Sequence, residues 1–232
     1  RLAESGAKIT LASRNEARLT QLKSELPDGP HDYLVLDQSK VSDLEEAADR
    51  LKNLAVDILI NNTGGPDPGL VHAEPWSKFE QALTQQLRCA HLLSTAALPH
   101  MQGQGYGRIV NVISTSVKIP IYGLGVSNTV RGAMASWSKT LSMEVAAQGI
   151  TVNNILPGFI ETGRLKQIVQ NRSEQTGRTY DDIAKEMQES VPAKRFGQIE
   201  EIGSLAVFLC GAEASYITGT NIPIDGGKTG TF

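Results

Sequence analysis

Short apolar segments alternate along the chain with longer segments in which apolar residues recur every three or four positions. The short segments lack polar alternation, which is typical of parallel strands buried on both faces, and the longer ones are typical of amphipathic helices. The predicted strands are 8–12, 33–36, 57–60, 108–113, 151–156 and 221–224, and the predicted helices include 76–101, 127–148 and 199–209. This alternation predicts a doubly wound α/β fold, in which helices cover both faces of a parallel sheet.

Polar or glycine-rich residues follow most of these predicted strands. In an open parallel sheet, ligands bind in the crevice beyond the carboxyl ends of the strands. The residues in that position are Ser13, Arg14, Asp37, Asn61–Gly65, Ser114 and Pro157–Thr162. We therefore expect the functional site to be assembled from these segments.

Composition excludes several other classes of protein. The 232 residues suit a single domain over 1–232, and the formal net charge of −3 argues against binding to nucleic acid. Two cysteines, Cys89 and Cys210, argue against a disulfide framework and favour a cytoplasmic location. No apolar run approaches the length of a membrane span, and the four histidines have no metal-ligand spacing.

The strand-end motifs, in their order and spacing, resemble the short-chain dehydrogenase/reductase family. The segments that carry the resemblance are ILINNTGG (58–65), GRIVNVIS (107–114), GITVNNILPGFIET (149–162), Arg195-Phe196-Gly197 and TGTNIPIDGG (218–227). Within the family, the sequence is most similar to 3-oxoacyl-carrier-protein reductases. The resemblance implies a Rossmann-type domain, an oxidoreductase activity on a small carbonyl or alcohol substrate, and a homo-oligomer, either a tetramer or a dimer.

One part of the family pattern is absent from the sequence. The family opens with a central strand and a glycine-rich turn, whereas Arg1-Leu2-Ala3 resembles the end of the helix that follows them. We expect about twenty further residues ahead of Arg1 in the natural protein, by analogy with the usual spacing. Without that strand, two inner strands would have unpaired edges.

The resemblance also implies how a dinucleotide would bind. Ser13 and Arg14 stand where many members have an acidic residue for the ribose hydroxyls, and a guanidinium can hold a 2′-phosphate, so NADP is expected rather than NAD. Asp37 matches a residue beside the adenine, with a turn residue as the alternative. The remaining matches are Asn61, Thr63 and Gly64 against the cofactor, and Pro157, Gly158, Ile160 and Thr162 over the nicotinamide. Asn61 has the alternative of bonding backbone between neighbouring strands, and the two roles can coexist.

The catalytic positions depart from the family pattern. Ser114 matches the family's serine, but Ser127 stands in the place of the tyrosine, Arg131 in that of the lysine, and Gln86 in that of the asparagine. Arg131 keeps a positive charge that could bond the ribose hydroxyls of the cofactor, so the resemblance also implies a cofactor-binding role for it. Ser127 and Arg131 are four residues apart and would share one helical face. A serine cannot replace a phenol as general acid, because its hydroxyl titrates far above one. Tyr122 is the alternative acid, and a loop-packing aromatic is its alternative role.

Two functional hypotheses remain open at this point. The first is an NADP-dependent reductase with altered acid chemistry, acting on a carbonyl compound such as a 3-oxoacyl thioester. The second is an inactive NADP-binding sensor or partner subunit. The polar stretch 163–190 is long for a connection and is expected to form a substrate-covering lid.

Overall fold

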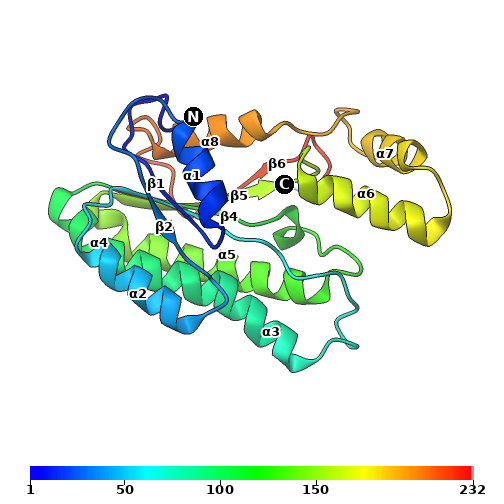
Figure 1. Cartoon of the computed structure of the whole chain (residues 1–232), viewed down its shortest axis with the longest axis horizontal. Helices are drawn as coiled ribbons and strands as arrows, with labels where there is room; N and C mark the ends of the chain where they lie inside the picture. Colours follow the sequence, from blue (N-terminus) through cyan, green and yellow to red (C-terminus); the bar gives the residue numbers. More distant parts are fainter. Residues whose placement is uncertain (231–232) are drawn as a thin grey trace.

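The strands found among residues 1–230 are all parallel to their neighbours, but they form two separate groups. In the computed structural model, which describes residues 1–230, the strands are β1 (Thr10–Ser13), β2 (Asp32–Val35), β3 (Ile58–Asn62), β4 (Gly107–Val112), β5 (Ile150–Pro157) and β6 (Asn221–Ile224). β1 pairs with β2, and the other four form a sheet in the order β3-β4-β5-β6 (Figure 1). Within residues 1–230, no strand ladder joins the two groups.

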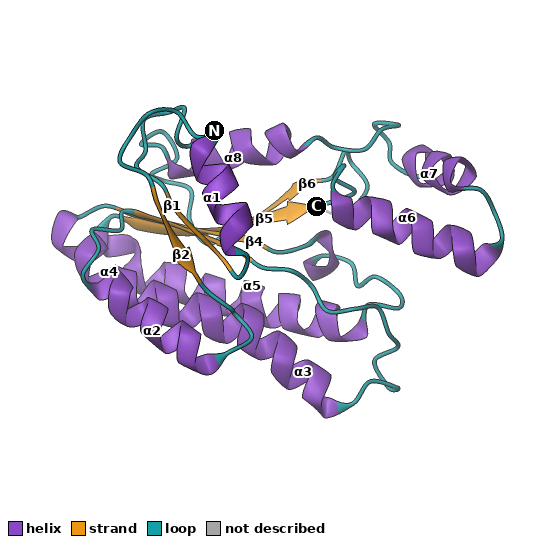
Figure 2. Ribbon diagram, in the orientation of Figure 1, coloured by secondary structure: helices purple, strands orange, loops and turns teal. Residues whose placement is uncertain are grey.

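Helices cover both faces of the sheet. Their bounds are α1 (Glu16–Ser24), α2 (Val41–Lys52), α3 (Trp76–Leu83), α4 (Cys89–Gln104), α5 (Gly125–Val145), α6 (Gly163–Thr176), α7 (Tyr180–Glu189) and α8 (Ile199–Cys210). Helices α2, α4 and α5 lie on one face, and α1 and α8 lie on the other (Figure 2). The doubly wound α/β prediction is confirmed. Among residues 1–230, no helix combines the length and the apolar composition that a bilayer crossing requires.

Local sequence signals explain several element boundaries. The Asn15 side chain accepts from the backbone N–H of Arg18 and caps α1, as expected. Gly149 adopts a φ of 74° after the helical segment that follows α5, a conformation that favours glycine. The predicted helix 76–101 exists, but a π-helical turn (Thr84–Arg88) separates α3 from α4. The limits of β6 are as predicted, and those of the other strands differ from the predicted ones by one or two residues.

A ladder of asparagine side chains crosses the four-stranded sheet. Asn61, Asn111, Asn154 and Asn221 occupy matched positions on β3, β4, β5 and β6. The amide nitrogens of the first three residues each donate to the amide oxygen of the next one, over 2.8 Å, 2.9 Å and 2.8 Å. Ser138 from α5 accepts from Asn111 and donates to Asn154. Asn61 therefore bonds to the neighbouring strand, but its partner is the Asn111 side chain and not the backbone that the alternative role required.

We expect the Asn111→Leu variant to be destabilised by about 2–4 kcal/mol, because the buried Asn61 amide loses its partner, and Asn154 and Ser138 each lose one of their hydrogen bonds. Urea unfolding measures this change. Asn171→Ala, which removes an exposed side chain on α6, is the control and should change stability by less than about 0.5 kcal/mol. Equal unfolding midpoints for the two variants would contradict the role of the ladder.

Candidate active site

Arg131 ties together the carboxyl ends of β3 and β4. Its side chain leaves α5 and donates to the carbonyl oxygen of Val112, the last residue of β4, over 3.1 Å. It also donates over 3.1 Å to the carbonyl of Thr63, which follows β3 directly. A single guanidinium therefore sets the relative position of two of the segments expected to form the site.

The positive charge of Arg131 is buried without an acidic partner. The residue is 6% exposed, and no ion pair found within residues 1–230 includes it. Burial disfavours the charged form and lowers the pKa of the guanidinium to about 10. At neutral pH the side chain therefore keeps its charge, and it places an uncompensated positive potential at this end of the sheet.

Ser127 and Arg131 meet at Gly65, in the loop after β3. A Cβ atom added to Gly65 would lie 4.0 Å from both Ser127 Oγ and Arg131 Nη2. The two side chains thus lie on the same side of α5, as their spacing suggested. Ser114 comes two residues after the end of β4, where its hydroxyl accepts from the Ser116 N–H over 3.1 Å. The strand ends bring these residues to one edge of the sheet.

Gln86 approaches the same loop from the π-helical turn between α3 and α4. It is 1% exposed, and its amide nitrogen donates to the Gly64 carbonyl over 3.4 Å. Its amide oxygen is buried and has no hydrogen-bond partner within the described residues. π-helical turns occur often at functional sites. The sequence does not reveal this turn, because the apolar pattern continues without a break from α3 through the turn into α4.

The residues expected around the adenosine lie after β1 and β2. Arg14 is exposed, and the Ser13 hydroxyl accepts from the Asn15 N–H over 3.2 Å. The Asp37 carboxylate accepts from the hydroxyl and the N–H of Ser39 over 2.6 Å and 3.0 Å. These two bonds, with smaller contributions from the charges of Lys40 and Arg14, lower the pKa of Asp37. Asp37 therefore shapes a turn, and it lies within electrostatic reach of Arg14.

The segment after β5 is held firmly in place. The Gly158 N–H donates to the Ile224 carbonyl over 3.0 Å, and a Cβ atom on Gly158 would lie only 2.7 Å from the Cβ of Asp225. Ile160 pairs with Gly197 in an isolated bridge. The Thr162 hydroxyl accepts from the Leu165 N–H and caps α6. Pro157 through Thr162 thus form a packed turn that leads into α6.

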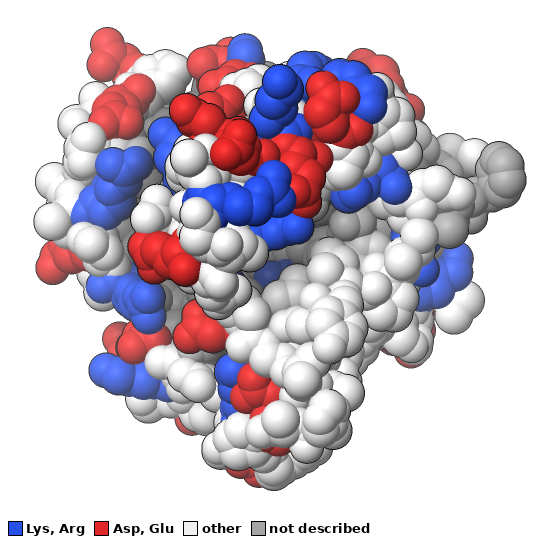
Figure 3. Space-filling view, turned by 90° about the vertical axis from the view of Figure 1, so that its right-hand side faces the viewer, with Lys and Arg blue, Asp and Glu red and all other residues white. Residues whose placement is uncertain are grey.

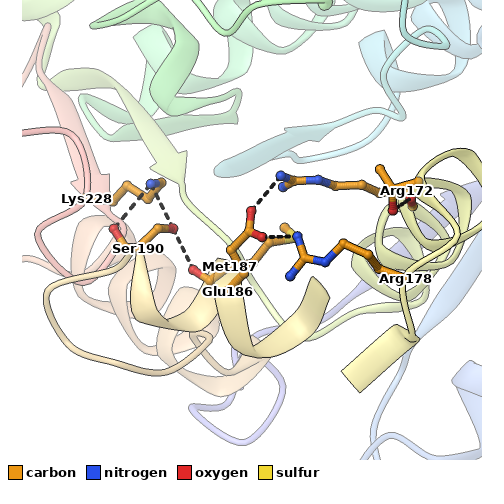
Figure 4. A network of polar contacts seen from close by, with 7 residues as sticks. Arg172, Arg178, Glu186, Met187, Ser190 and Lys228 are labelled. Atoms are coloured by element: carbon orange, nitrogen blue, oxygen red, sulfur yellow. Dashed lines mark hydrogen bonds and ion pairs between the residues drawn. The ribbon is translucent and has the colours of Figure 1, made fainter. Parts of the chain in front are cut away.

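Helices α6 and α7 form a small unit of their own beyond the strand ends. Four buried apolar side chains join them, namely Leu165, Val169, Ile183 and Met187. Glu186 accepts from both Arg178 and Arg172, and these bonds lower its pKa (Figure 4). The Arg164 side chain donates to the Pro66 carbonyl over 3.4 Å. This contact joins α6 to the loop after β3, and sequence reasoning did not identify it.

The strand-end edge carries an exposed positive charge and an open stretch of backbone. An exposed guanidinium follows β1, and Gly64 is exposed after β3, where an added Cβ atom would meet nothing within 4 Å. Backbone can therefore approach a ligand closely at this point, and Arg14 offers charge and paired donors. Within residues 1–230, no group of three or more histidine, cysteine, aspartate or glutamate residues could hold a metal ion.

Comparisons with known proteins agree with this architecture. Residues 1–229 match the family model described as enoyl-(acyl carrier protein) reductase. "Dehydrogenase/reductase SDR family member 4" of Oryctolagus cuniculus is 30% identical, and the match covers 98% of this chain and 86% of that protein. The structure of YwfH, an NADPH-dependent reductase involved in bacilysin biosynthesis, superposes with a TM-score of 0.93 at 28% identity, covering 100% of this chain and 92% of that one.

A further solved structure is L-sorbose reductase from Gluconobacter frateurii in complex with NADPH and L-sorbose. It is 26% identical with a TM-score of 0.90, and the match covers 100% of this chain and 90% of that chain. The fold and the strand-end site define a Rossmann-type oxidoreductase. The chain belongs to the short-chain dehydrogenase/reductase family.

We expect Arg131→Met to lower the free energy of unfolding by about 1–3 kcal/mol, because the carbonyls of Val112 and Thr63 lose their donor. The loss of a buried charge offsets part of that cost. Chemical denaturation measures the change, and Arg88→Met on the exposed side of the π-helical turn is the control. A stability equal to that of the control would mean that Arg131 does not tie the strands.

Proposed function

We propose that this oxidoreductase reduces a carbonyl compound, with a 3-oxoacyl thioester as one candidate, and that it uses Ser114, Ser127, Arg131 and Gln86 in place of the usual catalytic set. The observation that carries the proposal is the convergence of Ser127 and Arg131 on Gly65, beside the strand that delivers Ser114. A hydroxyl and a permanent positive charge then face the same loop. That arrangement can stabilise negative charge on a substrate oxygen.

The cofactor is NADP, which supplies a hydride when bound in its reduced form. YwfH and L-sorbose reductase are NADPH proteins by name, and the exposed Arg14 supports the same choice here. In this proposal Arg14 and Ser13 hold the 2′-phosphate, and Asp37 lies near the adenine. The loop Asn61–Gly64 and the turn Pro157–Thr162 line the remainder, with Ile160 and Thr162 at the nicotinamide end.

The proton must come from a group other than the usual phenol. Ser127 is too weak an acid, and Tyr122 is 91% exposed, so its hydroxyl faces solvent. The phenols of Tyr33 and Tyr106 are bonded to Glu16 and to the Cys210 carbonyl. We propose that the Ser114 and Ser127 hydroxyls donate hydrogen bonds to the substrate oxygen, that Arg131 stabilises its charge, and that water delivers the proton.

A second candidate is a non-catalytic NADP-binding sensor or partner subunit. The observation in its favour is the same replacement, because a serine stands where the acid is expected while the cofactor side keeps its guanidinium. In either case we propose one domain over residues 1–232 in which 163–190 covers the substrate. We also propose a cytoplasmic homo-oligomer that pairs through the helices carrying Gln86 and Trp137.

Purified full-length protein should bind NADPH and oxidise it in the presence of a suitable ketone, measured by fluorescence and by absorbance. The double variant Ser127→Tyr/Arg131→Lys should raise ketone reduction at least tenfold, because a phenol beside an ammonium is a general acid worth about 10²–10⁴-fold. NADPH binding without turnover by either protein would favour the sensor hypothesis. Loss of a native activity in Tyr122→Phe alone would instead assign the acid to Tyr122.

We expect Arg14→Ala to weaken NADPH binding about tenfold to a hundredfold and to leave NADH binding nearly unchanged, because only NADPH carries the 2′-phosphate. Titration of the nucleotide fluorescence measures both affinities. Arg18→Ala is the matched control, since this arginine is also exposed but lies one turn further along α1. An equal loss of affinity for NADPH and NADH would show that Arg14 does not bind the 2′-phosphate.

A further inference from the structure

Two loops that leave the candidate site are joined to each other. The loop 63–75 follows β3, and the loop 113–124 follows β4 and leads into α5. The Gly69 N–H donates to the Gly123 carbonyl over 2.7 Å, and the Gly125 N–H donates to the Gly69 carbonyl over 3.0 Å. A Cβ atom on Gly125 would lie 2.5 Å from the Cα of Val71. The two loops therefore form one continuous border beside Ser127.

Large apolar side chains on this border face solvent. We call them the apolar rim, which consists of Leu70, Val71, Ile119, Ile121 and Tyr122. Val71 is 55% exposed and Tyr122 is 91% exposed. Figure 3 views the end of the molecule where α3, α6 and α7 lie in Figure 1. Charged side chains gather in its upper part and down its left side, whereas the centre and lower right of this face are largely uncharged.

Few charges interrupt the rim. Asp67 on the first loop faces Arg164 of α6, with 3.9 Å between the charged atoms. Glu74 is paired with Lys78 over 2.7 Å and is mostly buried. Lys118 is exposed at the start of the second loop's apolar stretch. The hydroxyl of Tyr122 is the one polar group among the five rim side chains, so the rim offers little to a ligand that requires many hydrogen bonds.

We propose that the apolar rim binds the apolar body of the substrate, an aliphatic chain or ring attached to the reacting carbonyl group. Covering exposed apolar side chains is favourable, whereas hydroxyl groups placed on such a surface would lose hydrogen bonds to water. The substrate class is therefore a hydrophobic ketone or thioester rather than a polyhydroxylated sugar such as L-sorbose. The carbonyl part of this inference rests on the proposed function, but binding to the rim does not.

The test uses the full chain with NADPH and the ketones 2-butanone, 2-hexanone and 2-octanone, with L-sorbose as the polar comparison. We expect kcat/KM to rise about two- to fourfold for each added methylene group. A thermal-shift measurement with 2-octanone provides a readout that does not depend on turnover. A preference for L-sorbose, or a flat response to chain length, would overturn the proposal.

The double variant Val71→Ser/Ile121→Ser tests the rim itself. In this variant, kcat/KM should no longer rise with the chain length of the ketone. Both residues are exposed, so the fold should tolerate the change. Leu54→Ser is the control, because Leu54 is 40% exposed but lies before β3, at the opposite end of the strand. In the Leu54→Ser control, kcat/KM should rise with chain length as it does in the unchanged protein.

Three further outcomes separate the hypotheses. A thermal shift that the double variant abolishes, in a protein without turnover on any ketone, would retain the rim and reject the proposed reductase activity. If the double variant reduces ketones with the same dependence on chain length as the unchanged protein, the proposed reductase activity is retained and binding to the rim is rejected. A changed oligomeric state in size-exclusion chromatography, with no change in ketone binding, would make the rim an interface between copies and overturn the proposal.

Discussion

The asparagine ladder is the constraint on which the arrangement of the strand ends depends. A buried primary amide must satisfy both its donor and its acceptor, and here the two middle residues, Asn111 and Asn154, do so through the equivalent residues on the neighbouring strands. A slip of one residue between any two strands would point one amide to the opposite face and leave its neighbour unpaired. Apolar contacts tolerate small shifts better, because they have no direction. The ladder therefore fixes the register of β3 to β6, so that the loops that follow these strands lie side by side.

Arg131 extends that constraint from the sheet to the site. Its guanidinium can donate to two carbonyls at once because its donors form a fixed fork, which an ammonium group lacks. The same residue carries a buried charge that no carboxylate neutralises. Structural and electrostatic roles are thus combined in one side chain, at a place where the family pattern has lysine. A substitution there changes the position of the strand ends together with the potential that a substrate would meet.

The two sides of the site are built differently. The sheet side is rigid, because the ladder, Arg131 and the packed turn at Gly158 leave little freedom. The side proposed to face the substrate consists of two loops joined at Gly69 and of helices α6 and α7, which pack mainly on each other. Arg164 connects these helices to the first loop through exposed contacts, which are weak individually.

The sequence by itself determined the alternation of strands and helices, the family and the strand-end positions of the candidate site. These features follow from local rules: apolar runs, the Asn15 cap, the Gly149 turn and the four-residue spacing of Ser127 and Arg131. It did not predict the ladder, the carbonyl partners of Arg131, the π-helical turn at Gln86 or the apolar rim. Each of these depends on which residues from distant segments become neighbours. Only the tertiary structure decides that, because strand register and loop contacts bring together groups that the chain separates by tens of residues.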